Sequence, residues 1–297
     1  MLESTDTLWR YMKLSTLLLL MEGKAWFPSV AALRAGDPFE GALGEDFHQE
    51  LWRALERAGH GREDTQKWLF DSLPAVNQNS LNMNHGYPGL SSQQLGWAYS
   101  EALAKRRAVW CWFRSRRESA AMWSIYGHQG VAVMTDRKRL NDALKGAVPS
   151  VKHFRLQKMT YVDRSSGNHR YIGRILSKRR DLVLRPYFLK AIEYQHEKEL
   201  RVATFCATGN GGVMVPNIDP ALLIREIAIS PLLPAGEAAA IKQVVYRRID
   251  GVVFTVGQSV LTGEEKQIGL ANAITQDIGI SMAHDERSQL PAALRSL

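Results

Sequence analysis

Apolar and polar residues follow two different spacings along this chain, and each spacing predicts one kind of secondary structure. Short apolar runs bounded by polar or turn residues predict strands at residues 8–11, 25–27, 109–113, 130–134, 200–206, 224–229 and 251–256. Apolar residues at helical spacing predict helices at residues 14–21, 46–58, 62–70, 115–126, 137–145, 186–196 and 235–248. Because strands and helices alternate irregularly, we expect a mixed α/β, or α+β, fold.

Composition favours one globular domain. The chain has 297 residues, of which 45% are hydrophobic and 23% charged, values typical of a folded protein. We expect a single α+β domain over residues 1–280, with a basic insertion at about 151–185 and a weakly structured tail at 281–297. Residues 76–92 are rich in Asn, Ser, Gly and Pro, which predicts an exposed loop long enough to cover a site.

The net charge of +8 is concentrated in the middle of the chain. Lys and Arg outnumber Asp and Glu by 22 to 9 in residues 101–200, whereas residues 1–100 carry a net −4 and residues 201–297 a net −1. A strongly basic middle third beside near-neutral ends predicts attraction for a polyanion or a phosphate-bearing small molecule.

Several protein classes are disfavoured by what the sequence contains. Two cysteines, Cys111 and Cys206, are too few for a disulfide scaffold, and together with the absence of a recognisable signal peptide they favour a cytoplasmic protein. The longest apolar run, Leu17 to Met21, is too short to span a bilayer, so we expect no membrane partner. No phosphate-binding loop, dinucleotide-binding glycine motif or G-x-S-x-G motif is present. The sequence gives no indication of oligomeric state.

The most distinctive charged motif is Glu197-Lys198-Glu199-Leu200-Arg201. If a strand begins near Glu197, alternation places Glu197, Glu199 and Arg201 on one face. Two carboxylates and a guanidinium in one row can orient hydroxyl groups or stabilise a developing cation. The same spacing also suits a solvated strand face with cross-strand charge pairing.

Two aromatic segments are further candidates. In Leu8-Trp9-Arg10-Tyr11, an arginine between aromatic residues could bind a phosphate, or it could be an ordinary surface residue. The pattern Ser115-x-x-Glu118 fits a capping box that starts a helix through Tyr126. On that helix Ser119, Trp123 and Tyr126 share one face, which suits either a packed core or a stacking wall for a planar ring.

Basic residues of the middle third could bind nucleic acid or another acceptor. The candidates for such docking are Arg174, Lys178, Arg179 and Arg180, with Arg185 and Lys190 nearby. A solvated basic surface is the alternative. No clustered Cys or His spacing indicates a metal site, so we expect no metal. Asp37-Pro38-Phe39-Glu40 has the composition of a turn.

In order, these segments resemble a bacterial family known only as a domain of unknown function (number twenty-nine seventy-one). The blocks that carry the resemblance span residues 8–255 and are Leu8-Trp9-Arg10-Tyr11, Trp26-Phe27, Asp37-Pro38-Phe39-Glu40-Gly41, Trp110-Cys111-Trp112, Glu118 to Tyr126, Gly130-Val131-Ala132-Val133, His196 to Arg201, and Ile227-Ala228-Ile229-Ser230-Pro231. The chain departs from that pattern at Gly36, where an Asn is expected.

The layout also resembles, more remotely, that of ADP-ribosyltransferases. Those enzymes have an Arg or His on the first strand, a middle strand of small and aromatic residues, and a Glu or x-Glu-x-Glu on a late strand. The resemblance implies a split sheet core with surrounding helices and NAD as substrate. It implies NAD binding by Arg10 and Tyr11, a nicotinamide wall from Trp123 or Tyr126, catalysis by Glu199, and an acceptor oriented by Glu197. The Ser-x-Ser motif usual on the middle strand is replaced here by Trp110-Cys111-Trp112-Phe113.

The leading hypothesis is therefore an ADP-ribosyltransferase-like enzyme that cleaves the nicotinamide–ribose bond of NAD, as a toxin or anti-phage effector acting on nucleic acid or protein. One alternative is a non-enzymatic nucleic-acid-binding module. A second is a nuclease that gathers Asp37, Glu40, Glu197 and Glu199 around magnesium.

Overall fold

A computed structural model of the chain describes residues 7–37, 40–41, 45–57, 91–128, 130–147, 154–163, 185–205, 211–247 and 255–262. The expected helix at 62–70, nearly all of the loop at 76–92, the tail at 281–297 and most of the basic insertion lie outside these ranges. Within the described part, strands and helices are intermixed, which confirms the predicted mixed α/β class. None of its helices is long and apolar enough to cross a membrane.

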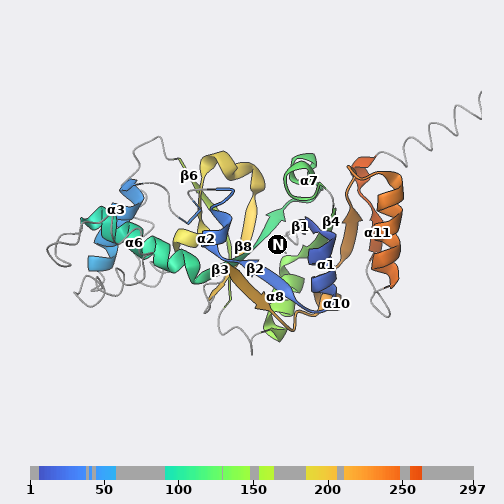
Figure 1. The fold of residues 1–297 in the computed structure, drawn as a ribbon, viewed down its shortest axis with the longest axis horizontal. Helices are drawn as coiled ribbons and strands as arrows, with labels where there is room; N and C mark the ends of the chain where they lie inside the picture. Colours follow the sequence, from blue (N-terminus) through green and yellow to red (C-terminus); the bar gives the residue numbers. More distant parts are fainter. Residues whose placement is uncertain are drawn as a thin grey trace, which may run out of the picture.

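A seven-stranded sheet forms the centre of the molecule (Figure 1). Its order is β11-β10-β4-β1-β3-β8-β5, and every neighbouring pair is antiparallel except β10 with β11. The strands are β1 (Thr7–Lys13), β3 (Arg107–Arg114), β4 (Gly130–Asp136), β5 (Arg155–Lys158), β8 (Glu199–Phe205), β10 (Glu226–Ile229) and β11 (Thr255–Gln258). Apolar and β-branched residues in short alternating runs favour these strands.

The sheet opens between two of its central strands. β1 pairs with β4 along all of its seven residues, but it pairs with β3 only through Leu8 with Arg114 and Trp9 with Phe113. Beyond Trp9 the two strands diverge, and Arg10 occupies the opening. Arg10 shares its alternation with the core residues Leu8 and Met12, but its Nη1 reaches across and donates to the carbonyl of Cys111 at 2.6 Å.

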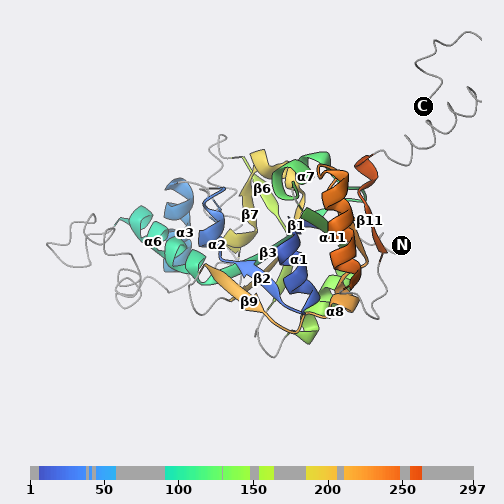
Figure 2. The same ribbon diagram turned by 45° about the vertical axis from the view of Figure 1, so that its right-hand side comes forward.

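One face of the sheet is covered by α1 (Leu14–Met21), α8 (Arg137–Gly146) and α11 (Ala235–Arg247), whose apolar residues pack in one core with Trp110, Trp112, Leu200 and Val202. The other face carries α7 (Ala120–Tyr126) over β1 and β4. It also carries α2 (Val30–Leu33), α3 (Glu45–Arg57) and α6 (Ser92–Lys105), which pack with η2 (Arg185–Phe188). The pair α3 and α6 lies at the opposite end of the molecule from α11 (Figures 1 and 2).

Two pairs of short strands and three helical turns complete the described fold. The strands β2 (Ala25–Pro28) and β9 (Gly212–Val215) form an antiparallel ribbon, and β6 (Thr160–Val162) pairs in parallel with β7 (Leu189–Ala191). The remaining helical turns are α10 (Pro220–Leu223), η3 (Ile192–Glu197) and η4 (Val260–Thr262).

Two local predictions are wrong, each for a physical reason, and one helix was not predicted. The expected helix at 186–196 is instead η2, the strand β7 and η3, because residues 189–191 pair with β6. The expected capping box at Ser115 does not form, since Ser119 caps α7 by accepting from the amide of Met122. A true capping box instead starts α6, where Ser91 and Gln94 satisfy each other's amides, although no helix was predicted there.

Candidate functional site

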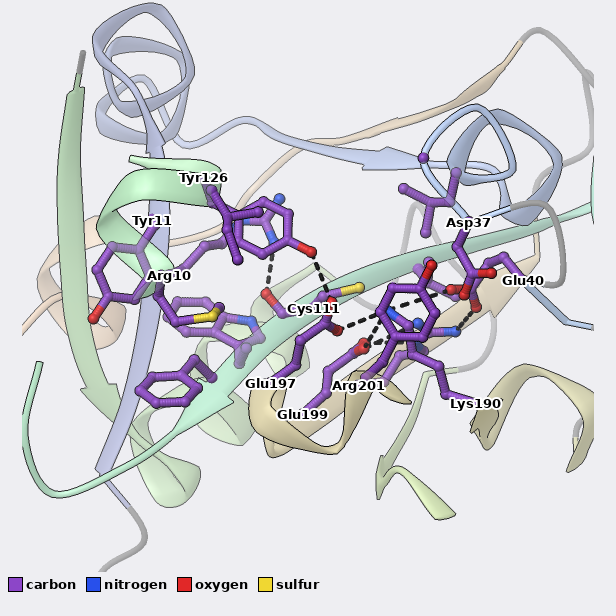
Figure 3. A pocket seen from close by; sticks show the side chains of 18 of the residues that line it. Arg10, Tyr11, Asp37, Glu40, Cys111, Tyr126, Lys190, Glu197, Glu199 and Arg201 are labelled. Carbon is purple, nitrogen blue, oxygen red and sulfur yellow. Dashed lines mark hydrogen bonds and ion pairs between the residues drawn. The ribbon is translucent and has the colours of Figure 1, made fainter. Parts of the chain in front are cut away.

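A cavity of about 570 Å³ lies over the opening between β1 and β3. Strands β1, β3 and β8 supply its floor, and α2, α7 and η3 supply its rim. Of the residues named as candidates from the sequence, those that line it are Arg10, Tyr11, Asp37, Glu40, Tyr126, Lys190, Glu197, Glu199 and Arg201. Their side chains converge from both sides of the cavity (Figure 3). The cavity therefore brings together residues that are up to 191 positions apart in sequence (Arg10 to Arg201).

The side of the cavity formed by β8 carries a buried ion pair. Glu199 and Arg201 are two residues apart on a strand, so both point to the same face. The Arg201 guanidinium donates twice to the Glu199 carboxylate, from Nε at 2.6 Å and from Nη2 at 3.1 Å. The exposed fractions are 0% for Arg201 and 4% for Glu199, which rules out the solvated-face interpretation of this motif.

Glu40 is a second carboxylate partner of Arg201. Its Oε1 accepts from Nη1 of Arg201, which also donates to the carbonyl of Tyr187 at 2.8 Å. Glu40 is 2% exposed and follows α2 in the segment that composition predicts as a turn. The backbone of Glu40 does close that turn, with its amide donating to the carbonyl of Asp37 at 2.9 Å. The segment is therefore both a turn and part of the site.

Lys190 links the remaining carboxylates. Its Nζ donates to Oε2 of Glu197 at 2.6 Å and lies 3.8 Å from Glu40 and 3.9 Å from Glu199. The hydroxyl of Tyr126 donates to the other oxygen of Glu197 at 2.8 Å. Lys190 is 7% exposed, so it is part of the site. It does not belong to a solvated basic surface, which was one interpretation of the basic residues in the sequence.

The backbone of the 197–201 motif turns at Lys198, before strand β8 begins. Lys198 has a φ of 42°, in the left-handed region, and β8 begins only at Glu199. Glu197 therefore ends η3, and simple alternation along one strand does not account for its position. It still lines the same cavity as Glu199, as expected, because the turn returns its side chain to Lys190.

The opposite side of the cavity, formed by β1 and α7, is aromatic and carries one cation. Among described residues Arg10 has no carboxylate within ion-pair distance; it contacts the carbonyl of Cys111 and the ring of Trp110, 5.5 Å from its guanidinium carbon. The hydroxyl of Tyr11 accepts from the amide of Ser119 at 2.9 Å and so ties β1 to the start of α7.

Trp123 does not line the cavity. It is fully buried behind the α7 side, its indole Nε1 donates to Glu118 at 2.8 Å, and its ring meets Tyr11 edge-on at 4.8 Å. Met122, Ile125 and Tyr126 of the same helix line the cavity instead. Of the two residues suggested as a nicotinamide wall, only Tyr126 is therefore in reach of a ligand.

Two effects compete to set the pKa values of Glu199 and Lys190: burial disfavours the charged form of each side chain, and nearby opposite charges favour it. Burial opposes ionisation of Glu199, but Arg201 outweighs it and holds the pKa of Glu199 below its usual value. Burial alone would lower the pKa of Lys190, yet the surrounding carboxylates, Glu199 foremost, raise it. Burial and the nearby Glu199 carboxylate raise the pKa of the Cys111 thiol. Glu199 and Lys190 therefore stay charged around neutral pH.

Sequence reasoning located the 197–201 motif and Arg10 but missed Cys111. Glu40 was considered only as a turn residue or a magnesium ligand, and Lys190 only as part of a series of basic residues that could bind nucleic acid or form a solvated surface. Cys111 was noted only as a residue of an aromatic strand. For Cys111 a signal existed: alternation along β3 places it opposite Arg201 once β3 and β8 are paired. Arg174, Lys178, Arg179 and Arg180 lie outside the described residues, so their docking role stays a prediction.

Comparison with known proteins leaves the site to be interpreted on its own geometry. No family model matches the sequence, and no curated protein or solved structure matches it either. Within the described ranges, no group of three or more His, Cys, Asp and Glu side chains is arranged to hold a metal ion.

Proposed function

We propose that this protein is an ADP-ribosyltransferase-like enzyme that cleaves the nicotinamide–ribose bond of NAD. The observation that carries the proposal is that Arg10 of the first strand and Glu199 of a late strand line one cavity, on either side of a middle strand, β3. The sheet opens where Arg10 lies, in keeping with the split sheet that the resemblance implies. Packing alone gives no reason for these two residues to meet.

The two sides of the cavity suit different parts of NAD. Arg10 has no carboxylate partner among the described residues, so its guanidinium is available for the pyrophosphate or a ribose hydroxyl. Tyr126 is 46% exposed and lines the cavity, where it offers a ring against which nicotinamide can stack. A volume of about 570 Å³ is within the range of small-molecule sites.

The charge of the β8 side suits the reaction. Cleavage of the nicotinamide–ribose bond leaves its electron pair on nicotinamide and positive charge on the ribose. Three buried carboxylates face two buried cations here, Glu40, Glu197 and Glu199 against Lys190 and Arg201. The net charge of this cluster is −1, and a preorganised charge of that sign beside the ribose would stabilise the developing cation and lower the barrier. Glu199 would hold the ribose 2′-hydroxyl, and Glu197 would orient the acceptor.

The acceptor, water or a group on nucleic acid or protein, adds to the ribose carbon and loses a proton. The basic residues at 174–180 remain the candidates for docking a polyanionic acceptor. A metal-dependent nuclease is less well supported, because Glu40, Glu197 and Glu199 already contact internal cations.

Nicotinamide release from NAD by the purified protein tests the proposal, with and without DNA, RNA and protein acceptors. We expect release by the wild type and a loss of at least about a hundredfold in Glu199→Gln, because the carboxylate that stabilises the cation is gone. The matched control is Glu193→Gln, an exposed carboxylate on η3, which should release nicotinamide at the wild-type rate. Circular dichroism confirms that each variant folds. Wild-type protein that leaves NAD intact with every acceptor would refute the proposal.

A further inference from the structure

Arg201 is shared between two carboxylates that belong to distant parts of the chain. Its Nε and Nη2 bind Glu199, and its Nη1 binds Glu40, so every nitrogen of the guanidinium has an acceptor (Figure 3). We infer that Glu40 and Arg201 form a positioning pair that fixes the orientation of the Glu199 carboxylate in the cavity. The catalytic consequence of this inference rests on the proposed function, but the geometry of the pair does not.

The arrangement fixes a plane as well as a distance. A guanidinium is planar and rigid, so two parallel hydrogen bonds to Glu199 hold that carboxylate in the plane of Arg201. Arg201 could rotate about its own side chain if Nη1 were free. Glu40 and the carbonyl of Tyr187 bind Nη1 and remove that freedom. Glu40 thus acts on Glu199 through Arg201.

The backbone around Glu40 is itself held at several points. Arg34 donates from Nε to the carbonyl of Glu40 at 2.9 Å, and Arg34 is ion-paired to Glu101 of α6. The next residue, Gly41, has a φ of 72°, and an added Cβ would lie 2.8 Å from a methyl carbon of Val30. Only glycine fits there without strain or displacement. A turn with no role beyond reversing the chain would not need its carbonyl tied to a second helix.

The negative charge of Glu40 also changes the electrostatic potential around Arg201. With Glu40, the buried cluster holds three carboxylates and two cations; without it, two carboxylates face the two cations, and Glu199 is the remaining carboxylate paired with Arg201 within the described part of the chain. Cys111 reports that potential, because its thiol lies beside Glu199, whose carboxylate raises the pKa of the thiol, and Cys111 is opposite Arg201 in the sheet. Since the chain has two cysteines, Cys206→Ser leaves Cys111 as a single thiol probe.

The kinetic test compares Glu40→Gln with Glu40→Asp. A positioning role predicts that Glu40→Gln lowers kcat for nicotinamide release at least about tenfold with KM within about twofold, since the binding contacts proposed for Arg10 and Tyr126 stay while the ion pair that holds Arg201 against Glu199 is lost. Glu40→Asp keeps the charge and should recover a large part of kcat. Ser230→Ala, which removes a buried hydroxyl outside the cavity, controls for a general loss of stability. Equal loss of kcat in Glu40→Gln and Ser230→Ala would overturn the inference.

The second test needs no reaction with NAD. In the Cys206→Ser background, the rate at which a small alkylating reagent modifies Cys111 follows the fraction of thiolate, tenfold for each pKa unit. We expect a rate at least about threefold higher in Glu40→Gln, a return toward the starting rate in Glu40→Asp, and a lower rate in Arg201→Met, which leaves two carboxylates without their cation. An unchanged rate in Glu40→Gln overturns the inference. If NAD is never cleaved but the alkylation rates change as expected, the coupling of Glu40 to the Arg201–Glu199 pair stands and the proposed function fails.

Discussion

The two sides of the cavity satisfy their charges in opposite ways. On the β8 side, Arg201 and Lys190 are buried among three carboxylates, and each cation has at least one short contact with a carboxylate. On the β1 side, Arg10 reaches the same cavity, but within the described part of the chain its guanidinium contacts a backbone carbonyl and an aromatic ring and no carboxylate. Both arginines come from central strands of one sheet, but Arg201 points to the cavity face of β8, whereas Arg10 alternates with the core residues Leu8 and Met12 and reaches the cavity through the opening beside β1.

This contrast separates two tasks. Charges that the protein pairs internally are fixed before a ligand arrives, which suits groups that must be oriented for chemistry. A cation that the protein leaves without a carboxylate retains its capacity for an anionic ligand. The β8 side is therefore the preorganised side, and the β1 side is the side whose interactions the proposed ligand would complete.

The largest expected effect is a difference in the free energy of unfolding between variants of the two arginines. Arg201→Met leaves Glu40 and Glu199 buried without their cation, which should lower the free energy of unfolding by about 3–5 kcal/mol. Arg10→Met removes one hydrogen bond to a carbonyl and should change it by no more than about 1.5 kcal/mol. Urea denaturation near neutral pH measures both values.

Lys138→Met, on the solvated face of α8, provides the control and should lie within about 0.5 kcal/mol of the wild type. If Arg10→Met proves as destabilising as Arg201→Met, Arg10 is a structural residue and the contrast between the two sides is lost.

A smaller effect appears with pH. Because Arg201 holds the pKa of Glu199 below its ordinary value of 4.5, the ionised carboxylate contributes stability that is fully present above about pH 4.5 and is lost as the pH falls through the lowered pKa. Glu199→Gln lacks that contribution at every pH. The stability difference between wild type and Glu199→Gln should therefore be greatest near neutral pH and shrink on acidification, as measured by urea denaturation from about pH 7 to about pH 3.

A difference that stays constant over this range would show that Glu199 contributes to stability by packing and not by its charge. Glu193→Gln serves as the reference, because that carboxylate is exposed and its removal should leave the acid dependence unchanged.

Local spacing was enough to place part of the site. Side chains two residues apart on a strand point to the same face, and this spacing alone predicted that Glu199 lies beside Arg201. The alternation of apolar residues likewise located β1, β3, β4, β8 and β10, and so fixed the class of fold. Both inferences use contacts between close neighbours in sequence.

The rest of the site depends on contacts that no local pattern encodes. Glu40 lies 161 residues before its partner Arg201, and its own neighbours specify a turn whatever its side chain does. Burial of Glu197 was likewise hidden, because charged residues in a row are most often solvated and only Lys190 and Tyr126 change that balance. The opening between β1 and β3 follows from strand pairing and has no sequence signature.

The start of α7 shows the same limit on a smaller scale. Ser115 and Glu118 have the spacing of a capping box, but Glu118 instead binds the indole of Trp123 and the hydroxyl of Ser259. Ser119 then becomes the cap. A tertiary contact from a residue 141 positions away thus decides between two adjacent local solutions.

The smallest expected effect tests two points: which serine caps α7, and whether the β1 side of the cavity binds NAD. Ser119→Ala removes the hydroxyl that caps α7 and should cost about 1 kcal/mol of stability, whereas Ser115→Ala removes only an acceptor for the exposed amide of Arg117 and should cost a few tenths. Urea denaturation of both variants measures the difference. Because α7 carries Tyr126, Ser119→Ala should also raise the KM for NAD slightly while kcat stays near the wild-type value, as expected if the β1 side binds NAD as proposed. A larger loss in Ser115→Ala would restore the capping box as the true start of the helix.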